Sequence, residues 1–423
     1  MQASSRPRSS SAPVVFFSAG EPSGDMHGAN LIRALRDRNP NVQARGFGGP
    51  RMADAGCQVD TDLTGIAAMW IVQALLNIHK FWAAFRQAGK IFRESCPDAV
   101  VLVDFPGFNW WLARRAKKHG IPVFYYAPPQ VWAWAQGRVK KMRKYVDHVL
   151  CSMSFEARWY AERGCNATLV GHPYFDEVIE HQLDDSFVQR LREDVRSVVA
   201  LLPGSRSQEV HKNFRWIAKA AARVKESVPE TRFVVAAFKE EQTEHIHQCL
   251  REAAVPADVF VGKTPEIIHA SDCAISVSGS VSLELMAHAT PTVIIYWVSR
   301  LPYLIQRVLR KVKYITLVNL LSADDAFSGS TSPFRRDQPG AEKVLFPEYV
   351  SCGDPSADIA WHITQWLTDD KARMERVERL NQLRAEICHP GAALAAADYV
   401  LAELRGEEQV DPSHLTKQTA QAA

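Results

Sequence analysis

Residues 14–28 read Val-Val-Phe-Phe-Ser-Ala-Gly-Glu-Pro-Ser-Gly-Asp-Met-His-Gly. A short apolar run, a glycine-containing turn and a helix-length segment follow one another, which is typical of a parallel α/β unit. The glycines allow a tight turn close to a ligand, and Ser23 or Asp25 could cap the helix expected over residues 25–38. A ligand-binding loop and a plain capped turn are both open. The GxGxxG spacing of dinucleotide-binding folds is absent, which disfavours a nicotinamide-linked oxidoreductase.

The same alternation continues along the chain and predicts two parallel sheets separated by a polar, acidic break at 171–186. The expected strands are 14–18, 43–47, 99–104, 121–126, 147–151 and 167–170, and then 197–202, 232–237, 257–261, 272–277 and 292–296. The expected helices are 25–38, 66–93, 109–119, 136–145 and 154–163, with helices alone over 356–404.

We therefore predict an α/β protein with two Rossmann-like parallel-sheet domains that face a cleft, because ligands bind beyond the carboxyl ends of such strands. The expected domains are 14–185 and 186–375, followed by C-terminal helices at 376–404 that cross back or swap between protomers. Residues 1–13 and 405–423 are polar and expected to be disordered.

Composition excludes several classes. A net charge of +3 over 423 residues argues against a dedicated nucleic-acid binder. The eight cysteines form no CxxC pair, so neither a zinc site nor a disulfide framework is indicated. The apolar stretch 63–78 is shorter than the roughly 20 residues of a membrane-spanning helix, so none is expected.

Two motifs in the first half carry candidate chemistry. Asp104 closes an apolar strand, where a carboxylate can act as a general base or simply cap the helix expected near Asn109. In Pro128–Trp134, Trp132 and Trp134 could wall a sugar or acyl chain, and the basic helix beginning near Arg138 could attract a phosphate or an anionic membrane. Core tryptophans and a solvated helix face are the alternative.

Two motifs in the second half each follow a strand. Leu201–Glu209 offers a glycine turn, a helix start and the guanidinium of Arg206, a combination that suits a diphosphate. Val277–Glu284 places small residues at a helix N-terminus, with Glu284 available for ribose hydroxyls. Either motif could be a plain cap, but their recurrence favours nucleotide binding.

Seven motifs together resemble the lipid-A-disaccharide synthase family, whose fold is that of GT-B glycosyltransferases. The resemblance extends from about residue 14 to 320, and the motifs keep the family's order and spacing. They are GEPSGDMHGA at 20–29, GFGGPRM at 46–52, DFPGFN at 104–109, PPQVWAW at 128–134, GHP at 171–173, LLPGSR at 201–206 and SGSVSLE at 278–284.

The resemblance implies an inverting, metal-independent hexosyl transfer without a cofactor. The donor would be UDP-2,3-diacylglucosamine, the acceptor 2,3-diacylglucosamine 1-phosphate, and the products a β-1,6-linked lipid A disaccharide 1-phosphate and UDP. It makes Asp104 the catalytic base. It assigns UDP binding to Arg206, Ser278, Gly279, Ser280, Glu284 and Asn319, and places Gly20, Glu21, Ser23, Gly24 and Asp25 in a glycine-rich loop near the cleft.

The chain departs from the family pattern at two places. Gly107 replaces a second aspartate that the family commonly carries, so Asp104 is the only carboxylate of its motif. Residues 322–345 form a polar insertion before Phe346-Pro347-Glu348, and a loop of this length is disordered or functional.

Acylated substrates require a surface that reaches a bilayer. Segment 65–86 combines Trp70, Trp82 and other apolar residues with nearby cations, as an interfacial helix does. Segment 300–313 is a similar candidate, but such stripes are more often core, and we prefer the membrane assignment for 65–86 alone. The expected location is cytoplasmic, peripheral on the inner membrane, with membrane lipids as partners, no nucleic acid, and either a monomer or a homodimer.

Two kinds of alternative remain open at this point. One keeps the fold but changes the reaction, to another UDP-sugar glycosyltransferase or a UDP-sugar epimerase. The other is a non-catalytic UDP-sugar-binding protein at a membrane surface, for which Gly107 is the single hint.

Overall fold

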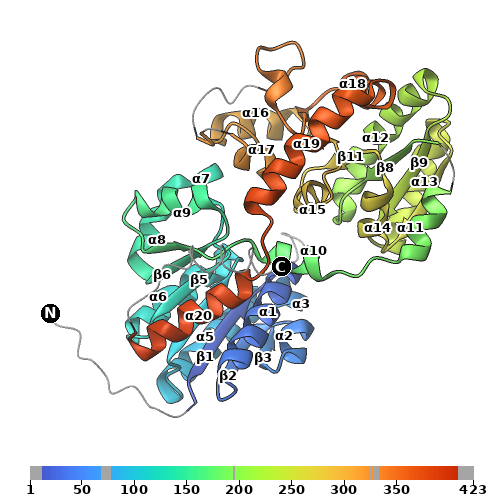
Figure 1. The fold of residues 1–423 in the computed structure, drawn as a ribbon. Helices are drawn as coiled ribbons and strands as arrows, with labels where there is room; N and C mark the ends of the chain where they lie inside the picture. The colour runs from blue at the N-terminus through green and yellow to red at the C-terminus, as the bar shows by residue number, and fades with distance from the viewer. Residues whose placement is uncertain (1–11, 68–77, 194–195, 324, 328–332, 408–423) are drawn as a thin grey trace. The chain divides into compact units, whose positions relative to one another are not determined.

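The computed structural model describes residues 12–67, 78–193, 196–323, 325–327 and 333–407. The chain divides into two compact units (Figure 1). Unit 1 comprises Met1–Asp176 and His389–Ala423, and unit 2 comprises Glu177–Cys388. The division follows Asp176 instead of residue 185.

Unit 1 is built on a seven-stranded parallel sheet in the order β3-β2-β1-β4-β5-β6-β7. All of its strands were expected except β3, whose polar sequence Gln-Val-Asp-Thr-Asp lacks the apolar run used to find the others. The strands are β1 (Val14–Ala19), β2 (Gln43–Gly48), β3 (Gln58–Asp62), β4 (Ala99–Val103), β5 (Val123–Tyr126), β6 (His148–Cys151) and β7 (Ala167–Leu169).

Helices α1 and α6 each begin about one turn earlier than expected, at Pro22 and Pro106, because proline suits the first turn of a helix. The long helix expected over 66–93 is described only as α3 and α5, and residues 68–77 lie outside the described residues. The helices of unit 1 are α1 (Pro22–Arg38), α2 (Pro50–Asp54), α3 (Leu63–Ala67), α5 (Ile78–Glu94), α6 (Pro106–Lys118), α7 (Val131–Trp134), η1 (Gln136–Arg138), α8 (Val139–Tyr145), α9 (Ser154–Ala161) and α20 (Ala392–Arg405), while α10 (Pro173–Glu180) crosses the boundary.

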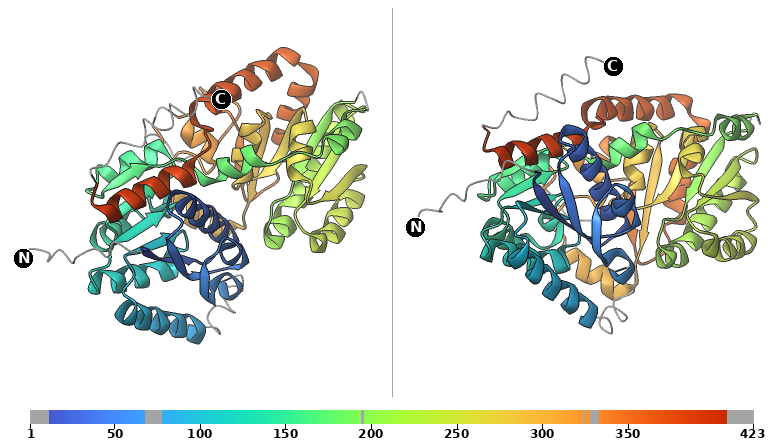
Figure 2. Two further views of the ribbon diagram at one scale, coloured as in Figure 1. Left: turned by 60° about the horizontal axis from the view of Figure 1, so that its bottom comes forward. Right: turned by 90° about the horizontal axis from the view of Figure 1, so that it is seen from below.

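The last helix, α20, is part of the unit 1 core. Its buried face includes Ala396 and Val400, which pack in the same cluster as β1 and α1. The Asp176 carboxylate accepts hydrogen bonds from the backbone N–H groups of residues 391–393 and so caps the start of α20. Figure 2 shows α20 beside α1, where Arg38 pairs with Asp398 at 2.8 Å. A swap of this helix between protomers stays a prediction.

Unit 2 contains a six-stranded parallel sheet in the order β10-β9-β8-β11-β12-β13. The four-residue β13 was not expected, because it follows the polar stretch 322–345. The strands are β8 (Val198–Leu202), β9 (Arg232–Ala237), β10 (Ala257–Val261), β11 (Cys273–Val277), β12 (Thr292–Trp297) and β13 (Glu348–Ser351).

The helices of unit 2 cover this sheet and build its core, in which Phe214 and Trp366 are buried. They are α11 (Asp185–Arg192), α12 (Ser207–Ser227), η2 (Glu240–Gln242), α13 (Thr243–Glu252), α14 (Thr264–Ala270), α15 (Val281–Ala287), α16 (Arg300–Leu309), α17 (Leu317–Leu321), η3 (Ala341–Lys343), α18 (Ser356–Thr368) and α19 (Asp370–Ile387). The α/β class with two parallel sheets is therefore confirmed. Among the described residues, no helix is both long and apolar enough to cross a bilayer.

Candidate active site

Asp104 lies where β4 ends and the chain turns into α6. Asp104 has φ +43° and Phe105 φ +46°, so two consecutive non-glycine residues occupy the left-handed region. Such backbone geometry is uncommon and concentrates at functional sites, where the surrounding structure must hold it in place. The side chain of Asp104 is half-buried at the carboxyl edge of the parallel sheet.

Asn109 and Tyr125 hold this turn. The Asn109 amide nitrogen donates to the Asp104 carbonyl oxygen at 2.8 Å, and the Tyr125 hydroxyl donates to the same oxygen at 2.7 Å. Burial, with a contribution from the Asp104 charge, raises the pKa of Tyr125 well above its usual value, so the phenol stays protonated as a donor. Asn109 was expected only as the site of a helix start, but it fixes the orientation of Asp104.

The glycine-rich loop packs directly against this turn. A Cβ on Gly20 would lie 2.3 Å from the Phe105 ring, so only glycine permits the contact. Gly24 is buried, Glu21 is half-buried and Ser23 is exposed. Glu21 occupies the N-cap position of α1 without a side-chain cap hydrogen bond. The loop and the Asp104 turn thus form one continuous edge of unit 1.

The expectation that Ser23 or Asp25 caps α1 is wrong. Asp25 lies inside α1, is 3% exposed, and accepts hydrogen bonds from the backbone N–H groups of Gly49, Arg51 and Met52. Its carboxylate therefore caps the start of α2, one strand further along the sheet. No local sequence pattern indicates this partner, because Gly49 lies 24 residues from Asp25.

Two histidines join the glycine loop in unit 1. Burial, with a contribution from Arg51, lowers the pKa of His27 to about 4. Burial, with a contribution from His27, lowers the pKa of His172 to about 3. Both imidazoles are therefore neutral near pH 7 and can donate or accept hydrogen bonds without carrying charge. His27 belongs to the GEPSGDMHGA motif at 20–29 and His172 to the GHP motif at 171–173, but neither histidine was singled out from the sequence.

An exposed aromatic surface leads away from the Asp104 turn. The Phe81 ring lies 6.2 Å from that of Phe105, and Trp82, Phe85 and Trp111 continue the row with centroids 5.7 and 6.3 Å apart. Trp82 is 60% exposed and Trp111 57%. We call Trp82, Phe85 and Trp111 the α5–α6 aromatic surface. Trp70 lies outside the described residues.

The two tryptophans of the 128–134 motif have different environments. Trp132 is 1% exposed, and its indole N–H donates to Glu156 at 2.9 Å. Burial raises the pKa of Glu156 to about 7. Trp132 is thus part of the core, whereas Trp134, at 44% exposed, and the exposed Arg138 can meet a ligand.

In unit 2 the loop at 203–206 follows β8 and the loop at 278–280 follows β11. These strands are neighbours in the sheet, so the two glycine loops lie at the same carboxyl edge. Gly204, at φ +99°, is so close to β11 that an added Cβ would lie 3.7 Å from the Cβ of Val277. Arg206 begins α12 with its side chain 73% exposed and 3.1 Å from Glu209. The helix start and guanidinium are therefore open to an anionic ligand.

The second loop is similarly open. Gly279 and Ser280 are exposed and Ser278 is half-buried. Nothing lies within 4 Å of a Cβ placed on Gly279. Glu284, one turn along α15, is 6% exposed. The backbone at Gly279 and Ser280 is therefore accessible to a ligand, whereas Glu284 is buried.

Asn319 is buried in the middle of α17, with 1% exposure. Its amide donates to the Phe346 carbonyl and to Glu348, and its side-chain oxygen accepts from the Phe346 N–H. All polar atoms of the side chain thus bind the segment leading into β13. Asn319 positions that segment, and the buried Glu348, named from the sequence only as the end of Phe346-Pro347-Glu348, accepts a hydrogen bond from it.

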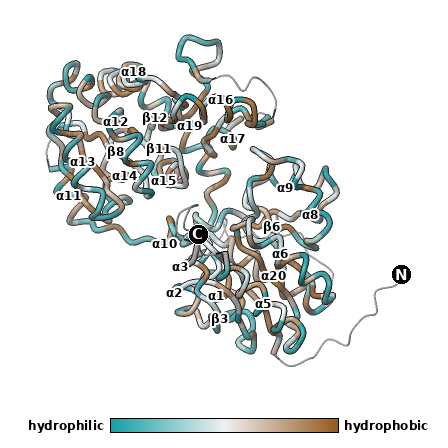
Figure 3. Tube along the Cα trace, turned by 180° about the vertical axis from the view of Figure 1, so that it is seen from behind, coloured by the Kyte–Doolittle hydropathy of each residue, from teal (hydrophilic) through white to brown (hydrophobic). Residues whose placement is uncertain are grey.

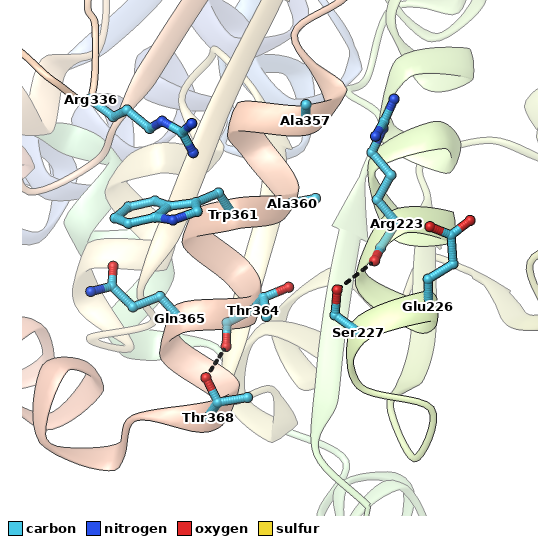
Figure 4. Close-up of a pocket in the computed structure, with 10 residues that line it drawn as sticks. All are labelled: Arg223, Glu226, Ser227, Arg336, Ala357, Ala360, Trp361, Thr364, Gln365 and Thr368. Atoms are coloured by element: carbon cyan, nitrogen blue, oxygen red, sulfur yellow. Dashed lines mark hydrogen bonds between the residues drawn. The ribbon is translucent and has the colours of Figure 1, made fainter.

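A separate pocket of about 500 Å³ lies between the C-terminal end of α12 and the length of α18, with Trp361 and Arg336 on one side and Arg223 on the other (Figure 4). Arg223 is 17 residues along α12 from Arg206, about 25 Å at 1.5 Å per residue. The pocket is therefore distinct from the edge that carries the glycine loops.

Comparison with solved structures defines the class. An S. aureus MnaA–UDP structure superposes with a TM-score of 0.63 at 11% identity, covering 95% of this chain and 99% of that chain. The structure of Medicago truncatula UGT71G1 complexed with UDP-glucose gives a TM-score of 0.57 at 14% identity, covering 93% of this chain and 98% of that chain. At these identities the likeness establishes the fold alone: the GT-B fold, shared by glycosyltransferases and UDP-sugar epimerases.

Sequence comparison gives the family. Residues 15–329 match the family model described as lipid-A-disaccharide synthetase. The lipid-A-disaccharide synthase of Trichlorobacter lovleyi is 37% identical over 388 residues, 92% of this chain and 96% of that protein. That of Coxiella burnetii is 31% identical, with 91% and 97% covered. The chain belongs to the lipid-A-disaccharide synthase family, which confirms the resemblance and the expected class of enzyme, a glycosyltransferase.

Proposed function

We propose that the chain joins two acylated glucosamines in lipid A biosynthesis. The donor is UDP-2,3-diacylglucosamine and the acceptor 2,3-diacylglucosamine 1-phosphate. The acceptor's 6-hydroxyl oxygen forms the new β-1,6 bond as the bond to UDP breaks, and its proton passes to the base. Family membership supports the pair of substrates, and the geometry at Asp104 supports the chemistry.

The observation that carries the proposal is the constrained turn at Asp104. An inverting transfer needs one base on the acceptor side, placed before the reaction begins. Asn109 and Tyr125 hold the Asp104 backbone through its carbonyl oxygen, and Asp104 and Phe105 both have left-handed φ angles at the strand end. Asp104 is the proposed base, and the neighbouring glycine loop and aromatic surface suit a sugar that carries acyl chains.

Unit 2 is the proposed donor-binding unit. Leaving-group charge on UDP has to be met by cationic or dipolar groups. The exposed Arg206 side chain, the start of α12 and the open backbone at Ser278, Gly279 and Ser280 can supply them. Glu284 is the proposed ribose contact, and Asn319 acts by positioning the 346–348 segment.

The substrates also set the proposed location, which is the cytoplasmic face of the inner membrane. Acylated sugars are retained in a bilayer, and the enzyme has to approach its surface to reach them. Trp82 on α5 and Trp111 on α6 are exposed and both contact Phe85, and this aromatic surface supports contact between unit 1 and lipid acyl chains. A homodimer remains a proposal to be tested by molecular mass in solution.

The test is UDP release by the purified chain with both acylated substrates in detergent. Asp104→Ala and Asp104→Asn should each reduce kcat by about 100-fold or more, since both remove the base. Asp54→Asn, at an exposed position on α2, is the matched control and should retain full activity. Activity of Asp104→Asn within about threefold of the parent would show that Asp104 is not the base.

Donor binding is tested with the variant Arg206→Ala. Loss of the exposed guanidinium should raise the donor KM by about tenfold or more, with a smaller effect on the acceptor KM. UDP binding without any turnover in the parent would instead indicate another acceptor or a protein that has lost catalysis.

A further inference from the structure

Helix α16 is amphipathic, and its apolar face is exposed while its opposite side contacts unit 2. Leu301, Leu304, Ile305, Val308 and Leu309 follow the i, i+3, i+4, i+7, i+8 spacing of a single helical face. In a globular protein that face ordinarily points into the core. Here all five side chains are exposed, between 49% and 74%, and no residue of the helix is buried.

The opposite side of the helix is the one that meets the protein. Tyr303 and Gln306 are half-buried, and Arg310, directly after the helix, is only 4% exposed and lies in the field of the Glu348 carboxylate. The C-terminal end of α16 is therefore anchored to the body of unit 2 through polar groups. The hydrophobic residues of this segment (Figure 3) stay largely exposed in the fold.

An isolated helix of ten residues is marginal in water, because most helical stability comes from covering an apolar face. The five aliphatic side chains of α16 form a contiguous exposed stripe, which marks an interaction surface. The positive charge around the stripe favours a negatively charged partner. No aspartate or glutamate occurs between Glu284 and Asp324, whereas Arg300, Arg307, Lys311 and Lys313 accompany the stripe.

We propose that α16 docks on the surface of a bilayer that contains anionic lipids, with its aliphatic stripe in the acyl region and its cations at the headgroups. Interfacial helices combine these two features. From the sequence, segment 300–313 was set aside because such apolar stripes are more often part of a core. No residue of α16 is buried, so that reason does not apply to it. The proposal deepens the proposed function, since it names the surface of unit 2 that brings the enzyme to a lipid substrate.

The experiment is co-sedimentation of the full chain with vesicles of zwitterionic lipid, prepared with and without anionic lipid. Leu304→Ser with Val308→Ser should weaken vesicle binding by at least about tenfold, because two exposed aliphatic groups lose their contact with the bilayer. Arg307→Gln with Lys311→Gln should weaken binding to the anionic vesicles alone. The matched control is Ile179→Ser with Met374→Ser, which removes two exposed apolar side chains of unit 2 outside α16.

Activity separates this proposal from the proposed function. UDP release from detergent-dispersed substrates should be the same for the Leu304/Val308 variant and the parent, whereas release from vesicle-embedded acceptor should fall with binding. No release from the parent in detergent would remove the proposed function and leave the vesicle result standing. Unchanged vesicle binding by the variant, or none by the parent, would overturn the docking proposal. A change in molecular mass without a change in vesicle binding would also overturn it, and would assign the stripe to a second copy of the chain.

Discussion

The Ser18 hydroxyl donates a 2.7 Å hydrogen bond to the side-chain oxygen of Asn109, joining β1 to α6 across 91 residues of sequence. Both residues are fully buried. The same Asn109 side chain donates to the carbonyl oxygens of Ser18, Val103 and Asp104. One amide thus ties the end of β4 to the end of β1, and the position of the proposed base depends on it.

Asn109→Ala should lower kcat by about 10- to 100-fold with a smaller change in KM, because the Asp104 turn loses its support while substrate contacts persist. Unfolding free energy should fall by about 2–3 kcal/mol, since buried acceptors are left unpaired. Kinetics in detergent and urea unfolding measure the two effects. Ser18→Ala removes one bond of the set and should have a clearly milder effect on both. Full kcat in Asn109→Ala would show that the turn holds without it.

Asp25→Ala should destabilise unit 1 by about 2–3 kcal/mol, because three backbone N–H groups at the start of α2 lose their acceptor. Asp25→Asn keeps one oxygen and should cost about half as much. Urea unfolding measures both, and Asp54→Asn on α2 itself is the control. Equal stability of the parent and Asp25→Ala would mean that water replaces the carboxylate without loss.

Gly107→Asp introduces a second carboxylate into the Asp104 motif. Nothing lies within 4 Å of a Cβ at this position, which is exposed in the first turn of α6. Helix propensity and the favourable charge at a helix N-terminus together predict a gain of about 0.5–1 kcal/mol. Thermal unfolding should show a higher Tm.

The charge added by Gly107→Asp should also move the acid limb of the kcat/KM profile to higher pH, since it disfavours ionisation of Asp104. An acid limb at the same pH as in the parent would mean that the two carboxyls are too far apart to interact.

The stability of unit 2 should depend on pH through His362. Burial, with contributions from Arg376 and Arg336, lowers the pKa of His362 to about 3, and the Tyr349 hydroxyl lies 2.9 Å from Nε2. The unfolded chain takes up the proton first as pH falls, so stability is present above pH 6.5 and is lost progressively toward pH 3. Between pH 7 and pH 5 the loss from this residue is about 2 kcal/mol.

His362→Gln removes this ionisation while offering Tyr349 a polar partner. The difference in unfolding free energy between pH 7 and pH 5 should shrink by about 2 kcal/mol in that variant. His247→Gln, at an exposed position on α13, is the control. An unchanged pH difference in His362→Gln would mean that other groups account for the acid sensitivity.

The sequence predicted the fold well where apolar runs mark buried parallel strands, as at 99–104 and 197–202. It missed β3, whose residues are mostly polar, and the four-residue β13, which follows a polar stretch and pairs through Glu348 with the distant Ile294 of β12. Such edge strands have no local signal strong enough to distinguish them from loops.

The candidate site was predicted unevenly for the same reason. Asp104 and Arg206 could be expected from a strand followed by a turn, because that position is set locally. The roles of Asp25, Trp132 and Asn319 depend on partners 24 to 27 residues away, at Gly49, Glu156 and Phe346. Hydrogen bonds over such distances follow from the folded arrangement, so motif spacing alone could not distinguish a ligand contact from a structural one.

The packing of α20 in unit 1 has a consequence for folding during translation. Residues 177–388 are interposed between the two parts of unit 1, and α20 contributes buried residues to the same core as β1 and α1. Domains that are contiguous in sequence can fold in order as they leave the ribosome. Here the second unit can be complete while the first still lacks its final helix. The nascent chain must carry an unfinished apolar surface on its N-terminal part through most of translation, which makes unit 1 the part most dependent on chaperone protection.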